Sequence, residues 1–242
     1  MNDEITTCVD EVTRDGYYVW RSFIDVERCA RLGDQADALL QSAAARVYPR
    51  SIRVWELYRH GSVFVNVLCD SRLYDAVARI LGAGAIVSDF SLNRVIRGGS
   101  SDRWHIDYPY NEMDNLVSGS LLGLQCIMPL SPFDASTGAT QFVPRSHRRY
   151  SWPPETLDGE QTETFVAEPG DLLVLAAGSW HRAGTNTTDL PRTAILFSFV
   201  ERWIRPMIGP PEPGPWGDTQ EARIILGIDR LPEEMPLDGV PA

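Results

Sequence analysis

Residues 169–200, PGDLLVLAAGSWHRAGTNTTDLPRTAILFSFV, alternate short apolar runs with turns. Leu172–Leu175 and Thr193–Val200 are rich in Leu, Val, Ile and Phe, while Gly, Pro, Ser and Asn interrupt the segment between them. Comparable runs occur upstream at Ile86–Ile96, Ser120–Met128, Ala139–Val143 and Glu163–Val166. Strands this short and this evenly spaced predict an antiparallel sandwich or barrel with helices packed outside it.

The residues before this β-rich region show helical periodicity. Asp25 is a candidate N-cap, with apolar residues at helical spacing after it, and a second helix is predicted over Ser71–Leu81. We therefore expect one domain, mostly β with flanking helices. Its predicted parts are a helical N-terminal part over about 22–82, a β core over about 86–203, and a Pro- and Gly-rich C-terminal strap over 205–242.

Composition excludes several classes of function. The 22 basic and 33 acidic residues give a net charge of −11, which disfavours nucleic acid and anionic membranes as partners. All the basic residues are Arg, so no Lys can form a Schiff base or hold phosphates in a P-loop. The four Cys form no metal or redox motif, the acidic N-terminus lacks an apolar leader, and no apolar run could span a bilayer. These features predict a cytoplasmic protein.

Three residues have the types and the spacing of a metal centre. His105 and Asp107 are two apart, so in an extended segment their side chains point to the same side. His181 follows the predicted strand Leu172–Leu175, as expected when another strand supplies a third ligand. Two His and one carboxylate are the ligand set of non-haem Fe(II) oxygenases. An H-x-D pair alone is weak support, but Arg192, with ten residues between it and His181, could bind a dicarboxylate co-substrate in bidentate fashion.

Three segments carry a resemblance to a known family. They are Trp104-His105-Ile106-Asp107, then Gly138–Arg148 with the sequence GATQFVPRSHR, and Pro169-Gly170-Asp171 followed by Trp180–Gly184 and Arg192. Together they resemble the phytanoyl-CoA dioxygenase family of Fe(II)/2-oxoglutarate oxygenases, over about Gly16 to Trp203. One departure is Arg145, where the family usually has Gly. Because Gly suits a left-handed turn, we expect the local backbone to differ there.

The resemblance implies a double-stranded β-helix (jelly-roll, cupin-like) core and an oxygenase that hydroxylates, desaturates or cyclises a small molecule. It implies that His105, Asp107 and His181 bind Fe(II), that Arg192 and Gln125 bind 2-oxoglutarate, and that O2 is the other co-substrate. Neighbours of these positions are expected to form the substrate pocket: Asn93, Trp104, Tyr108 and Trp180. For these aromatic side chains ordinary core packing is the alternative. The conspicuous His147 is expected to be structural.

Two other functions fit part of this pattern. Two His and a carboxylate also suit Zn²⁺, so a jelly-roll isomerase or hydrolase without redox chemistry is one alternative. A non-catalytic domain that binds a small molecule is the other. Arg192 separates them from the oxygenase, because neither needs a site for a dicarboxylate. The substrate, and whether the protein is a monomer or a homodimer, stay open.

Overall fold

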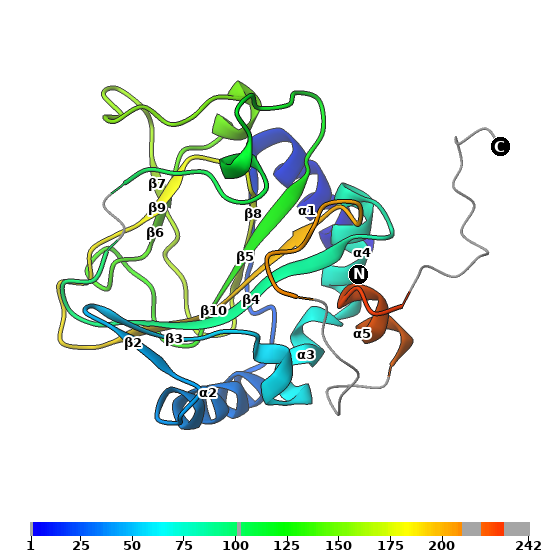
Figure 1. Ribbon diagram of the computed structural model, residues 1–242. Coiled ribbons are helices and arrows are strands. Elements are labelled where there is room, and N and C mark those ends of the chain that lie inside the picture. Colours follow the sequence, from blue (N-terminus) through cyan, green and yellow to red (C-terminus); the bar gives the residue numbers. More distant parts are fainter. Residues whose placement is uncertain (1, 101–102, 210–218, 230–242) are drawn as a thin grey trace.

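Two antiparallel sheets form the centre of the computed structural model, which describes residues 2–100, 103–209 and 219–229 (Figure 1). The larger sheet has the strand order β1-β8-β5-β10-β4-β3-β2, and the smaller has the order β7-β6-β9. The strands are β1 Tyr17–Trp20, β2 Arg46–Tyr48, β3 Ser51–Val54, β4 Ile86–Val95, β5 Gly123–Pro129, β6 Thr140–Phe142, β7 Glu163–Thr164, β8 Leu172–Ala176, β9 His181–Ala183 and β10 Arg192–Val200. The predicted mostly-β architecture is confirmed.

Helices cover the outer face of the larger sheet. They are α1 Asn2–Asp15, α2 Val26–Leu40, α3 Ser62–Leu68, α4 Ser71–Leu81 and α5 Gln220–Ile225. The main core lies between these helices and the sheet, where Cys8, Leu32 and Leu73 are fully buried together with Phe197 and Phe199 of β10. None of the helices in the described ranges is long and apolar enough to cross a membrane.

Alternation along β10 separates this core from a cavity. Odd-numbered residues from Ile195 to Phe199 face the helices, whereas Arg192, Ala194, Leu196 and Ser198 line a cavity on the opposite face. This is the period of two that a strand imposes on its side chains. The cavity is also lined by residues of β6 and β9, so it lies between the two sheets.

The structure corrects part of the predicted N-terminal boundary. Within residues 22–82, which were expected to be helical, Arg46–Tyr48 and Ser51–Val54 are strands that form a hairpin and extend the larger sheet through β4. Their Val, Ile and Tyr content favours strands, and Pro49 lies in the turn between them. Helix α1 was not predicted, although Ile5, Cys8 and Val12 have helical spacing. Of the strap, 210–218 and 230–242 lie outside the described residues.

Arg145 keeps the left-handed conformation that the family's Gly would favour, with φ 63° and ψ 4°. The expected difference in the backbone is therefore wrong. Asp15 holds this turn, because its backbone oxygen accepts from Arg145 N at 2.7 Å and its Oδ1 accepts from Nε at 2.8 Å. His147, two residues further on, is buried with Nε2 3.2 Å from the carbonyl oxygen of Thr13. It lies against the end of α1 and is not among the three clustered metal-ligand candidates.

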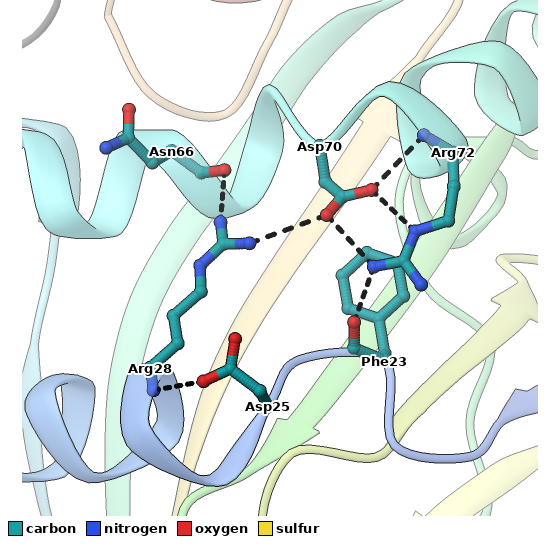
Figure 2. Close-up of polar contacts among 6 residues, drawn as sticks. All are labelled: Phe23, Asp25, Arg28, Asn66, Asp70 and Arg72. Atoms are coloured by element: carbon teal, nitrogen blue, oxygen red, sulfur yellow. Dashed lines mark hydrogen bonds and ion pairs between the residues drawn. The ribbon is translucent and has the colours of Figure 1, made fainter.

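One carboxylate joins α2 to the α3–α4 segment (Figure 2). Asp70 is the N-cap of α4, accepting from Arg72 N at 3.2 Å and Arg72 Nε at 3.0 Å. It also faces Arg28 of α2 at 3.5 Å. The two arginines continue the network, because Arg72 donates to the carbonyl oxygen of Phe23 and Arg28 to that of Asn66.

We expect Asp70→Ala to lower the free energy of unfolding by about 2–4 kcal/mol, because it removes an N-cap and leaves two partly buried guanidinium groups without their anion. Urea denaturation measures the change. Asp75→Ala is the control, since Asp75 forms an exposed i,i+4 pair with Arg79 on the same helix and should change stability by less than about 0.5 kcal/mol. Equal effects of the two substitutions would show that the Asp70 network contributes no special stability.

Candidate metal centre

His105, Asp107 and His181 come together in the wall of the cavity. His105 lies in an extended segment beside β9, and the His105 and His181 backbones exchange two hydrogen bonds of 3.0 Å each. Asp107 Oδ1 is 3.8 Å from His105 Nε2, and Asp107 Oδ2 is 3.3 Å from His181 Nε2. One potential ligand atom from each residue lies within 4.8 Å of the others. Three protein ligands so close together can hold one metal ion.

Backbone carbonyls orient both imidazoles. His105 Nδ1 is 3.1 Å from the carbonyl oxygen of Arg103, and His181 Nδ1 is 2.9 Å from that of Ser179. Since a carbonyl can only accept, each Nδ1 carries a proton, which leaves Nε2, the nitrogen on the Asp107 side, as the atom that can give its lone pair to a metal ion. This is the second contact that metal-bound histidines commonly make, and it sets the tautomer required for coordination.

The charges of the three groups are coupled. Burial disfavours the charged form of His181, but the Asp107 carboxylate beside it outweighs burial and raises the His181 pKa. Burial likewise opposes ionisation of Asp107, yet His181 and His105 hold the pKa of that carboxyl below its usual value. Burial and the nearby His181 lower the pKa of His105. A divalent cation bound here would replace the proton that His181 shares with Asp107.

Trp104 and Trp180 do not line the cavity, contrary to expectation. Each immediately precedes a histidine of the cluster in extended chain, so its side chain points to the opposite side. Trp180 is a buried member of a separate apolar cluster that also contains Ile106, and the partly buried Trp104 packs against that cluster. Trp180 Nε1 donates to the Ser151 carbonyl oxygen at 2.8 Å, and the Arg182 guanidinium lies over the Trp104 ring. For these two residues the alternative of core packing holds.

The cavity beside the cluster has a volume of about 330 Å³. Three other residues expected at the site, Asn93, Tyr108 and Gln125, do line it. Sequence reasoning missed several further lining residues: Arg53, Trp55, Asp89, Asn111, Phe133, Thr140 and Met207. The alternation of the polar Asp89, Ser91 and Asn93 with the apolar Phe90 and Leu92 was a usable signal. Arg53 is in the hairpin and Trp55 directly follows it, within the range that was expected to be helical, so neither was placed on the sheet.

Arg192 presents a buried cation to the cavity. Only 5% of the residue is exposed, and its Nη1 has no hydrogen-bond partner among the described residues. Its guanidinium lies 5.0 Å above the ring of Phe133, and burial lowers its pKa to about 10. A buried donor without an acceptor is costly, so this position fits a carboxylate that enters from the cavity.

The arrangement is a double-stranded β-helix with a two-histidine, one-carboxylate cluster facing an internal cavity. The family model for phytanoyl-CoA dioxygenase matches residues 12–194. The chain therefore belongs to the phytanoyl-CoA dioxygenase family, a family of Fe(II)- and 2-oxoglutarate-dependent dioxygenases.

Individual relatives are more distant. The Mycobacterium tuberculosis protein Rv1501 is 30% identical over 105 residues, which are 43% of this chain and 37% of that protein. The dioxygenase af480 of Aspergillus fumigatus is 27% identical over 157 residues, covering 62% of this chain and 48% of its own. The chain thus spans less than half the length of either relative.

Solved structures share the fold. The epimerase SnoN, crystallised with Fe3+, alpha ketoglutarate and nogalamycin RO, superposes with a TM-score of 0.70 at 17% identity. The match covers 90% of this chain and 93% of SnoN. In the present chain the donor set suits iron, and the buried guanidinium suits a carboxylate.

We expect His181→Ala to abolish stoichiometric binding of Fe(II), because it removes one of three clustered ligand atoms from a buried position. Anaerobic titration with Fe(II) measures this loss, and circular dichroism checks that the fold persists. His60→Ala is the control, since His60 lies in the short helical turn Leu57–His60, outside the cluster, and should leave metal affinity unchanged. Full Fe(II) binding by the His181 variant would contradict the assignment.

Proposed function

We propose that this protein is an Fe(II)/2-oxoglutarate-dependent oxygenase that hydroxylates, desaturates or cyclises a small molecule. In this proposal His105, Asp107 and His181 hold the iron, and Arg192 binds the 5-carboxylate of 2-oxoglutarate. The observation that carries it is the unpaired guanidinium of Arg192 in the same cavity as the three clustered ligands. A hydrolase or isomerase that uses a metal has no need of a buried cation at this position.

Different residues of the chain bind the metal ion, orient the co-substrate and line the cavity. His105, Asp107 and His181 converge from the cavity wall, so they would hold the ion there and leave it accessible from the cavity. Bound iron with 2-oxoglutarate supplies O2 activation coupled to oxidative decarboxylation of the co-substrate. Arg192, fixed over Phe133, orients one end of the co-substrate, and the apolar Ile127, Ala194 and Leu196 line the cavity wall and limit the entry of water.

We predict that Arg192→Gln raises the 2-oxoglutarate concentration needed for half-maximal succinate formation by about 30-fold or more, since loss of one partner of a buried charge pair typically costs about 2–5 kcal/mol. Lys at this position should rescue only partly, because it lacks the planar pair of donors. Fe(II) affinity, measured separately, should stay near that of the unmodified protein.

Arg94→Gln is the matched control for this experiment. Arg94 is on the neighbouring strand β4, on the face away from the cavity, where it pairs with Asp37 and Thr193. Its substitution should leave the co-substrate titration unchanged. If Arg192→Gln also left that titration unchanged, the non-redox metalloenzyme would become the better interpretation.

A further inference from the structure

A row of three polar side chains crosses the cavity face of the larger sheet. In the strand register Ser198 of β10 is paired with Asp89 of β4 on one side and with Gln125 of β5 on the other. All three line the cavity. Side chains in register on adjacent strands are close neighbours on one face, so they form a single polar surface.

This row is far from the position proposed for the co-substrate carboxylate. Ser198 is six residues along β10 from Arg192, which is about 20 Å of extended chain. A five-carbon dicarboxylate is only about as long as two extended residues, roughly 7 Å. Because strand side chains stand roughly perpendicular to their sheet, a molecule of that size held by Arg192 occupies one end of the cavity and leaves the row to the second reactant. In this arrangement Gln125 contacts that reactant and not 2-oxoglutarate, which is the partner expected for it from the sequence.

Asp89 is an anion without a cationic partner in this row. Its Oδ2 accepts from Ser91 Oγ at 3.0 Å, and its carboxylate makes no ion pair within 4.0 Å in the described part of the chain. Burial raises its pKa to about 6, and the charge of Asp107 adds a little to this rise. Hydrogen bonds from Ser91 and from the Phe90 backbone, together with the charge of Arg53, offset it only in part. A desolvated carboxylate of this kind is stabilised by a ligand that brings a hydrogen-bond-donating cation.

Arg53 supplies the opposite charge in the same cavity. Its guanidinium lies 5.2 Å from the centre of the Trp55 ring. Over residues 2–100, 103–209 and 219–229 it forms no ion pair with any carboxylate. Across the strands Arg53 is in register with Asn93, whose buried Oδ1 also has no partner among these residues. An anion and a cation therefore line one cavity without forming an ion pair with each other.

We propose that Asp89 and Arg53 are the two charged anchors of the substrate subsite, and that the substrate is a zwitterion bearing an amino and a carboxylate group. Asp89 accepts from the amino group, with Ser198 and Gln125 beside it, and Arg53 donates to the carboxylate. Trp55, Tyr108 and Met207 supply apolar wall for the rest of the molecule. The inference rests on the proposed function, because it takes the Arg192 end of the cavity to be filled by 2-oxoglutarate.

A matched trio of probes tests the pair of charges. L-Phenylalanine carries both groups, 2-phenylethylamine only the amine, and 3-phenylpropionate only the carboxylate. Calorimetric titration uses the full chain loaded with Mn(II) and 2-oxoglutarate without oxygen, which prevents turnover. We expect phenylalanine to bind at least about tenfold more tightly than either single-charge probe, as for a charge-assisted hydrogen bond worth one decade of affinity.

Two variants assign the anchors. Asp89→Asn should weaken phenylalanine binding about tenfold and leave 3-phenylpropionate within about twofold, and Arg53→Gln should show the reverse selectivity, sparing 2-phenylethylamine. Asp75→Asn and Arg79→Gln, a pair of opposite charges exposed on α4, are the matched controls and should change nothing. The comparison of the three probes on the unmodified chain needs no variant, so it holds even where a variant fails to fold.

Other outcomes would overturn the inference. One is that phenylalanine binds no more tightly than either single-charge probe, and another is that no probe binds. A third is that phenylalanine binds but neither variant changes its affinity, which would show that it coordinates the metal instead. The proposed function is tested apart from it, by iron-dependent consumption of 2-oxoglutarate by the unmodified chain. Consumption without a preference for the zwitterion refutes only the subsite, whereas no consumption and no iron binding refute the proposed function itself.

Discussion

The pair of backbone hydrogen bonds between His105 and His181 determines how the site is built. It brings an extended segment, which lies outside any regular strand, against β9 and fixes its register there. Once the register is fixed, the alternation of side chains along an extended chain decides which side each residue faces. His105, Asp107 and His181 face one side, and Trp104, Ile106 and Trp180 enter an apolar cluster on the other. That cluster anchors the segment, so the precision of the polar site depends on the packing behind it.

The same alternation organises the larger sheet. On β10 the residues that face the helices are large and apolar, and those that face the cavity run from Arg192 through Ala194 and Leu196 to Ser198. One strand therefore gives the cavity wall a charged end, an apolar middle and a polar end. The neighbouring strands β4 and β5 place further polar side chains in register with the polar end of β10. Two different reactants can therefore each have a region of the cavity suited to their chemistry.

Much of this was predictable from the sequence because it depends on local spacing. Helix α4 agrees with the predicted Ser71–Leu81, and the His105, Asp107 and His181 cluster follows from spacing together with the family resemblance. The predictions that were wrong concern features that depend on tertiary contacts. The hairpin of β2 and β3 is short and becomes a strand pair only because β4 offers it a sheet edge. Arg145 keeps a left-handed turn because Asp15, distant in sequence, holds it.

That hairpin also determines how the larger sheet ends. β2 is three residues long, all of them exposed, and it is the last strand on its side of the sheet. Its outer backbone groups form an open template to which a strand of another molecule could add. Short length and the charged Arg46 are features by which proteins discourage such pairing. The larger sheet thus ends in a strand that is too short, and too polar at its start, to promote aggregation, although Val47 stays uncovered.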